Sequence, residues 1–170
     1  MAKPMRARAD FEVDAPFFSP YDKAVVEYLE NERKKKMKVY EHFTQYYETD
    51  QMGIVHHSNF IRWLEEARVD YMDQIGFGYH RMEAEGIVSP VLEVNCQYKQ
   101  MVRFHEWVQI AAKVRKYNGV RLCLDYEIVK KEEQTLCATA SSMHCFLDKE
   151  GAIVRLQKVC PELDQKLRAW

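Results

Sequence analysis

The sequence predicts an α+β fold in which one long amphipathic helix packs against a largely antiparallel β-sheet. Two observations lead to this prediction. From residue 58 to residue 75 the apolar residues repeat at intervals of three and four, which is the period of a helix that buries one face. After residue 91 the period changes to two, and turn residues separate the alternating segments, as expected for antiparallel strands joined by hairpins.

The chain has the size and composition of a single soluble globular domain. Its 170 residues are 47% hydrophobic and 12% aromatic, which is enough to fill one core. The 25 basic and 26 acidic residues nearly cancel, so no broad basic field would attract nucleic acid or an anionic membrane. No segment approaches the ~18 apolar residues of a membrane span, and the N-terminus lacks the apolar region of a secretory signal. We therefore expect a cytoplasmic protein with no nucleic-acid partner and no membrane span.

The cysteines give no sign of a metal or redox centre. There are five, they are scattered, and no two form a C-x-x-C pair. Several lie in apolar stretches, where a buried and reduced thiol is the usual state. We expect free thiols at Cys96, Cys123, Cys137, Cys145 and Cys160.

Residues 1–36 are expected to form an N-terminal extension that is partly disordered and contains one short amphipathic helix. Ser19 and Asp22 fit a capping box at the start of that helix. Its short apolar stripe comprises Ala24, Val25, Tyr28 and Leu29. A strand-like segment begins after this extension, so we expect the working domain to comprise residues 37–170.

The first elements of this domain are a strand and the long helix. The segment MKVYEHFTQYY, residues 37–47, is dense in aromatic and β-branched residues, which favours a strand. The five-turn helix over residues 58–75 is expected to end near Gly76, and a short second helix follows over residues 79–86. The apolar face of the long helix comprises Phe60, Trp63, Leu64, Ala67, Tyr71 and Ile75.

Four alternating segments follow and complete the predicted sheet. They lie near residues 92–98, 108–114, 120–128 and 136–147. Asn118 and Gly119 between two of them predict a type I′ hairpin, because both central positions of that turn require a positive φ. Short charged turns separate the later segments.

The stretch YYETDQMGIVHHSNFIRWLEEAR resembles the signature of the 4-hydroxybenzoyl-CoA thioesterase-like family of hotdog-fold acyl-CoA thioesterases. In that family an aspartate precedes a glycine by three positions and the central helix by about seven, and the helix carries an E-A-R triplet. Asp50, Gly53 and the triplet at residues 66–68 match this pattern. The resemblance extends more loosely over residues 38–156. It implies the hotdog fold, an antiparallel sheet wrapped around one long central helix.

The resemblance also implies an activity, the hydrolysis of an acyl-CoA thioester to a free acid and coenzyme A. Asp50 would act as general base or as nucleophile, and the sequence leaves both roles open. The donor that stabilises the oxyanion maps to the backbone N–H of His57, in the first turn of the helix. The expected substrate contacts are Gly53, Asn59 and Arg103, with Arg103 directed at the phosphates of coenzyme A.

The sites of the family lie between two subunits, so the resemblance implies a homodimer or a homotetramer. It implies no cofactor, because coenzyme A is part of the substrate. Asp50, His56 and His57 have the side chains of metal ligands, but adjacent histidines rarely point in the same direction at a helix entrance. We therefore expect no metal site.

Other assignments remain open. Another branch of hotdog thioesterases places its catalytic carboxylate on the central helix, where Glu65 or Glu66 could serve, although ion pairing is the ordinary role of such a residue. A hotdog hydratase or dehydratase would require an asparagine-proline-leucine-histidine context, which is absent. A non-catalytic acyl-CoA-binding module would need no carboxylate at position 50. The chain also departs from the family at Met101, where a proline is usual.

Overall fold

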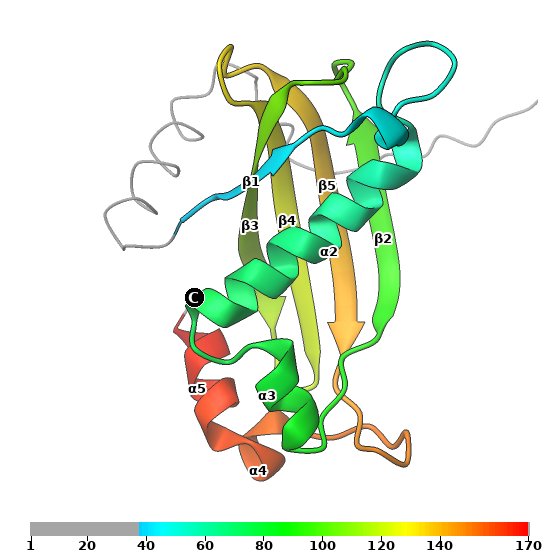
Figure 1. Cartoon of the computed structure of the whole chain (residues 1–170). Coiled ribbons are helices and arrows are strands. Elements are labelled where there is room, and N and C mark those ends of the chain that lie inside the picture. Colours follow the sequence, from blue (N-terminus) through cyan, green and yellow to red (C-terminus); the bar gives the residue numbers. More distant parts are fainter. Residues whose placement is uncertain (1–37, 170) are drawn as a thin grey trace, which may run out of the picture.

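The computed structural model of the protein describes residues 38–169, so the extension predicted over residues 1–36 lies outside the described residues. The described chain forms one five-stranded antiparallel sheet, and a long helix lies across one face of it (Figure 1). This arrangement confirms the predicted α+β class. The boundary between extension and domain stays a prediction.

The strands do not follow one another across the sheet in sequence order. The order is β1-β3-β4-β5-β2, and all neighbours are antiparallel. The two edges are therefore formed by β1 and β2, and the segment after β2 crosses to the opposite side of the sheet before β3 begins (Figure 1). The strand bounds are β1 (Tyr40–Phe43), β2 (Val91–Tyr98), β3 (Trp107–Tyr117), β4 (Arg121–Lys130) and β5 (Leu136–Cys145).

Both helices predicted within residues 38–169 are present. The long helix is α2 (His57–Gln74), and the short one is α3 (Tyr79–Ala84). A single turn of 3-10 helix, η1 (Tyr46–Glu48), ends the predicted first strand early. Two C-terminal helices, α4 (Leu156–Val159) and α5 (Pro161–Arg168), were not predicted, and they lie beside α3 at one end of the sheet (Figure 1).

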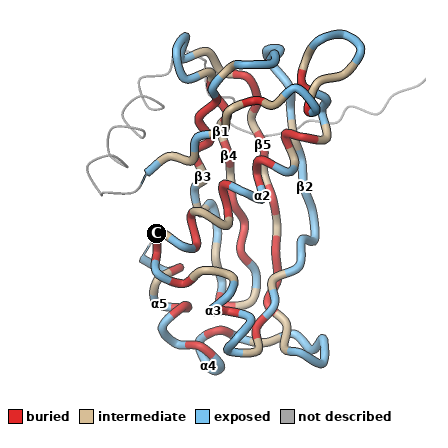
Figure 2. The backbone as a smooth tube through the Cα atoms, viewed as in Figure 1, coloured by how far each residue is buried: buried red, intermediate tan, exposed pale blue. Residues whose placement is uncertain are grey.

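The core lies between α2 and the inner face of the sheet. The apolar face of α2 is buried as its sequence pattern predicts, and Trp63 has no exposed surface. Each large side chain buried there stabilises the fold by about 1.5–3 kcal/mol through the loss of its contact with water. One strand differs, because seven of the eight residues of β2 are exposed (Figure 2). The helix covers the centre of the sheet and leaves the β2 edge open.

The hairpin between β3 and β4 is confirmed, but its predicted turn type is wrong. Gly119 has a φ of 85°, whereas Asn118 is not in the left-handed region. The connection has three residues, and the Asn118 side-chain oxygen accepts the N–H groups of Val120 and Arg121 at 3.0 and 2.8 Å. These side-chain hydrogen bonds close the turn with a positive φ at Gly119 alone, whereas a type I′ turn needs a positive φ at two residues.

All five cysteines are free thiols, as predicted, and four of them are buried. Among residues 38–169, no helix has the length and apolar character needed to cross a bilayer.

Candidate active site

The segment between η1 and α2 reverses direction within a few residues. The Asp50 N–H donates to the Ile54 carbonyl at 2.9 Å, and the Gly53 N–H donates to the Asp50 carbonyl at 2.9 Å. Gly53 has a φ of 69°, a conformation that glycine adopts without the steric penalty of a Cβ atom. Thr49 and Val55 face each other in an antiparallel bridge, and the His56 N–H donates to the Glu48 carbonyl at 2.8 Å, so the segment that carries Asp50 runs beside the residues that lead into α2 (cyan in Figure 1).

The first turn of α2 presents an unpaired backbone donor. His56 is the N-cap, and its Nδ1 accepts the Ser58 N–H at 3.3 Å. His57 is the first helical residue and is exposed. Within residues 38–169, the His57 N–H has no hydrogen-bond acceptor. This donor therefore stands free at the positive end of an 18-residue helix.

The carboxylate of Asp50 is partly buried and only partly engaged. One of its oxygens accepts the Met52 N–H at 2.8 Å. Its other oxygen makes no hydrogen bond to any described residue, which leaves lone pairs open toward a ligand or water. No cluster of three potential metal ligands occurs among the described residues.

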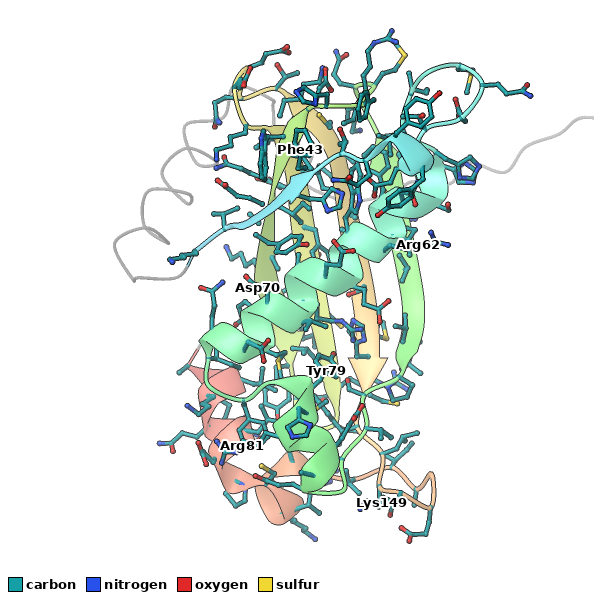
Figure 3. The ribbon with its side chains drawn as sticks, in the orientation of Figure 1. Phe43, Arg62, Asp70, Tyr79, Arg81 and Lys149 are labelled. Carbon is teal, nitrogen blue, oxygen red and sulfur yellow. The ribbon has the colours of Figure 1, made fainter. Side chains whose placement is uncertain are left out.

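The loop between β2 and β3 brings a cation to the same place. Ile54 and Arg103 form an antiparallel bridge, and the Arg103 Nη1 lies 3.5 Å from the Gly53 carbonyl oxygen. The Arg103 carbonyl accepts the hydroxyl of buried Thr44 at 2.7 Å, which holds this turn against the end of β1. The structure thus gathers Asp50, Gly53, His57 and Arg103 at one end of the molecule. Figure 3 shows that Phe43 and Arg62 mark this end of β1 and of α2.

Such an arrangement has the parts that acyl transfer requires. A carboxylate can activate water or attack a carbonyl carbon, and a free N–H at a helix start can stabilise the negative charge that forms on the carbonyl oxygen. An exposed guanidinium beside them can bind a phosphate group.

Known proteins are similar to this chain in sequence and in fold. A sequence model of the thioesterase-like superfamily matches residues 44–170. The chain belongs to this family. It is 34% identical over 130 residues to the Bacillus subtilis (strain 168) protein named "Putative acyl-CoA thioesterase YneP", a match that covers 76% of this chain and 90% of that protein. The predicted enzyme class, a thioester hydrolase, is confirmed by this membership.

Solved structures of related proteins confirm the predicted hotdog fold. The structure of a DHNA-CoA thioesterase from Staphylococcus aureus is 33% identical, has a TM-score of 0.75 and covers 78% of this chain and 89% of its own. A hypothetical protein from Aquifex aeolicus is 29% identical, has a TM-score of 0.71 and covers 76% of this chain and 98% of its own.

In this member of the thioesterase-like superfamily, Asn59 lies on the inner side of the loop. The side chain is buried, and its Nδ2 donates to the Glu48 carbonyl at 2.7 Å. Its Oδ1 accepts from the Arg62 guanidinium at 3.3 Å. The amide therefore ties the loop to α2, and its predicted contact with substrate stays a prediction.

Tyr98, at the end of β2, also reaches the helix start. Its hydroxyl donates to the His57 carbonyl at 3.2 Å, and its ring meets the Phe60 ring edge-on with the centroids 5.2 Å apart. Burial, followed by the neighbouring Cys96, raises the pKa of Tyr98 to about 12, so the hydroxyl remains a donor at neutral pH. Sequence reasoning missed this residue because no local signal shows that the end of β2 meets the start of α2.

Glu48 is a second acid that sequence reasoning missed, although it stands two residues before Asp50. The residue is 4% exposed, and its carboxylate accepts hydrogen bonds from the Gln45 N–H, the Trp63 indole and the His42 ring. Burial by itself would raise the pKa of Glu48, but these three hydrogen bonds outweigh it and lower the pKa below the usual value. The carboxylate is thus held ionised inside the protein.

The two glutamates of α2 differ in their contacts. Glu66 accepts the Tyr40 hydroxyl at 2.7 Å and lies 3.2 Å from Nδ1 of His42, so it joins α2 to β1. Burial, and then the bond to Glu66, raises the pKa of Tyr40 above its ordinary range. Glu65 is exposed on the helix surface.

Arg68, the last residue of the E-A-R triplet, lies in the core. It is 5% exposed and its Nη1 bonds to Nδ1 of His144 at 2.7 Å. The other nitrogen of His144 bonds to Ser142 at 2.7 Å. Burial, and then the Arg68 cation, lowers the pKa of His144 to about 4, so the ring is neutral near pH 7 and accepts from Arg68.

Proposed function

We propose that the protein is an acyl-CoA thioesterase, which uses water to convert an acyl-CoA into a free acid and coenzyme A. The observation that carries this proposal is the loop reversal that pairs the segment carrying Asp50 with the residues leading to the His57 N–H. The printed names of the Bacillus subtilis and Staphylococcus aureus relatives support the choice of a coenzyme A thioester. The proposed location is the cytoplasm.

Asp50 supplies the carboxylate in either of two routes. As a base it takes a proton from water, whose oxygen attacks the thioester carbon; the C–S bond then breaks and the coenzyme A thiolate recovers the proton. As a nucleophile it attacks the carbon itself, coenzyme A leaves, and water then hydrolyses the mixed anhydride. Each route consumes one water and yields the same products.

The His57 N–H stabilises the negative charge on the carbonyl oxygen in both routes. This donor is built into the helix, so it needs no reorientation when the charge forms. A preorganised donor of this kind typically lowers the barrier by about 3 kcal/mol.

Arg103 binds a phosphate of coenzyme A in this proposal, and Gly53 lets the ligand approach the loop backbone. Both residues lie at the exposed surface of the loop, whereas Asn59 is turned inward. We therefore propose that these two residues contact the substrate and that Asn59 holds the loop, while its own substrate contact stays a prediction. The proposal involves no metal or redox cofactor.

A second copy of the chain completes the site by pairing with β2. Within the described chain β2 pairs with β5 alone, so one row of its backbone groups is unpaired. Such a long, exposed and apolar edge is a ready template for another strand. Its exposed apolar side chains are Val91, Leu92, Val94 and Tyr98. Because Tyr98 touches His57, a partner at this edge would lie next to the reacting groups.

Thiol release from a panel of acyl-CoAs tests the proposed activity. We expect turnover with the wild-type protein and a loss of ~100-fold or more in Asp50→Asn, which removes the base or nucleophile with little change in volume. Asp148→Asn is a matched control, because Asp148 also accepts backbone N–H groups in a loop, at 3.1 and 2.8 Å. Equal turnover in all three proteins would refute the role of Asp50, and no thiol release at all would favour a non-catalytic binding module.

A further inference from the structure

Glu48 connects both halves of the proposed site through its backbone. Its carbonyl oxygen accepts the His56 N–H at 2.8 Å and the Asn59 side chain at 2.7 Å. His56 directly precedes the proposed oxyanion donor, and Asp50 follows Glu48 by two residues. Glu48 is therefore linked to Asp50 through the chain and to the His57 N–H through its hydrogen bond with His56.

The side chain of Glu48 fixes the same junction from within. One oxygen accepts the Trp63 indole N–H of α2 at 2.7 Å, and the other accepts the Gln45 N–H of the loop base at 2.7 Å. The Nε2 of His42 lies 3.0 Å from the carboxylate. Three donors, from β1, from the residue before η1 and from α2, thus meet on a buried group, which leaves the carboxylate little freedom to move.

We infer that Glu48 is a positioning residue, whose buried carboxylate sets the separation between Asp50 and the His57 N–H. The inference rests on the proposed thioesterase function. Glu48 contacts neither of these groups with its side chain, so its effect on the reaction passes through the loop and the helix start. A displacement of about 1 Å in a reacting group is enough to reduce turnover by ~100-fold.

The site requires a carboxylate because donors face both of its oxygens. A glutamine has the same shape but offers one oxygen and one NH2 group. In Glu48→Gln the NH2 group would therefore face either the Trp63 indole or the Gln45 N–H, donor against donor. The His42 ring relieves only part of this conflict: when its Nδ1–H donates to the Glu66 carboxylate at 3.2 Å, its Nε2 can accept from the NH2 group, but that group still faces the indole or the Gln45 N–H. The backbone around Gln45 and Glu48 would then shift, and Asp50, two residues further along, would shift with it.

Steady-state kinetics of Glu48→Gln provide the test. We expect kcat to fall by ~10- to 100-fold with KM within about threefold of wild type, because Arg103 and Gly53 still face the ligand. Asp164→Asn is the matched control. Asp164 is a buried carboxylate that accepts from Tyr117 and Arg168 at 2.7 and 2.8 Å, and it belongs to α5, at the other end of the sheet. Asp164→Asn should lower the free energy of unfolding and leave kcat unchanged. Equal kcat values in Glu48→Gln and Asp164→Asn would overturn the inference.

A double variant separates positioning from a general loss of structure. If Glu48 acts through Asp50, then adding Glu48→Gln to Asp50→Asn should lower the remaining turnover by less than about twofold. Additive losses would overturn the inference. Normal turnover in Asp50→Asn would instead refute the proposed function, and the role of Glu48 with it.

Trp63→Phe keeps the inference testable if Glu48→Gln does not fold. This change leaves the carboxylate in place and removes the α2 donor that orients it. We expect a several-fold fall in kcat with KM unchanged. A folded Trp63→Phe protein with wild-type kcat would contradict a positioning role for this contact.

Discussion

His57 takes part in the proposed reaction through its backbone, whereas Asp50 takes part through its side chain. This difference can be tested because the His57 N–H has no acceptor within the described chain and its imidazole is exposed. A substitution can therefore remove the ring and keep the donor, or remove the donor and keep a helix.

We expect His57→Ala to lower kcat by less than about fivefold and His57→Pro to lower it by ~100-fold. Proline has no N–H, and it suits the first position of a helix. The preceding residue, His56, has a ψ of 135°, which is the conformation that proline requires before it. Circular dichroism would verify that α2 is intact in both proteins, and similar losses in the two would assign the role to the imidazole.

The buried His144 makes stability depend on pH. Its pKa is lowered to about 4 by burial and then by Arg68, while an unfolded histidine titrates near the ordinary value of 6.5. Between these values the unfolded chain binds a proton that the folded chain does not bind, so stability falls as pH falls from 6.5 to 4. The contribution is on the order of 2–3 kcal/mol.

His144→Gln isolates this contribution, because glutamine can still accept from Arg68 and donate to Ser142. In urea unfolding at several pH values, the free-energy difference between wild type and variant should change by this amount from pH 7 to pH 4. A constant difference would show that His144 does not titrate in this range. The difference between the two proteins is the relevant quantity, because Glu48 and Asp164 also have lowered pKa values. Their contributions to the free energy of unfolding decrease in acid in both proteins.

Single residues of the site differ in how far the sequence reveals them. Asp50, Gly53 and His57 lie within one short segment, so their spacing could be compared with a family pattern. Glu48 lies two residues before Asp50, but the role inferred for it rests on its burial among Trp63 and other donors, which the sequence does not reveal. Arg103 was named from the sequence, but its contact with Gly53, fifty residues away, depends on the pairing of two loops.

Among the elements, α2 was predicted to within about one residue at each end, because five turns of apolar periodicity give a strong signal. The first strand was predicted too long. The Gln45 N–H binds the Glu48 carboxylate and starts a 3-10 turn, which the aromatic content of the segment hides.

The sequence of the C-terminal helix α5 carries start and end signals of a helix. Proline stands at its first position, two acids lie in its first turn, and two bases lie in its last turn. Leu163 and Leu167 form its buried face. The helix is only eight residues long, so its periodic signal is short compared with that of α2.

The junction between β1 and the β2–β3 loop depends on Thr44. Its hydroxyl donates to the Arg103 carbonyl at 2.7 Å and accepts the Glu106 N–H at 2.9 Å, and the residue has no exposed surface. Thr44→Val keeps the shape and leaves both backbone groups without this partner. We expect a loss of about 2–3 kcal/mol in the free energy of unfolding.

Urea unfolding with Thr139→Val as the control measures this effect. Thr139 is half-exposed on β5, so its substitution should change stability by less than about 0.5 kcal/mol. If the two variants were equally stable, the Thr44 hydroxyl would not hold the loop.

For the molecule as a whole, the open β2 edge predicts self-association. A charge at Val94, which is 36% exposed on this strand, should repel an apolar partner strand. We expect Val94→Lys to convert a dimer into monomers. It should also reduce thiol release, because the site would lose the second copy of the chain beside β2. Val159→Lys places the same charge at an exposed apolar position on α4 and should do neither.

Sedimentation velocity at several concentrations would give the two oligomeric states. A wild-type protein that is monomeric and fully active would contradict the proposed completion of the site by a second copy. The choice between dimer and tetramer stays a prediction from the family resemblance.

The strand order has a consequence for how the enzyme becomes active during folding. The hairpins of β3, β4 and β5 join neighbours in sequence, whereas β1 pairs with β3 across about 65 residues and β2 pairs with β5 across about 45. Closing those long loops costs more chain entropy, so the central meander should form first and the two edge strands should dock later. The loop that carries Asp50 follows β1, and the loop that carries Arg103 follows β2. The end of the molecule that carries Asp50 and Arg103 would thus be assembled last. A newly made chain would form its central sheet before it could cleave a thioester.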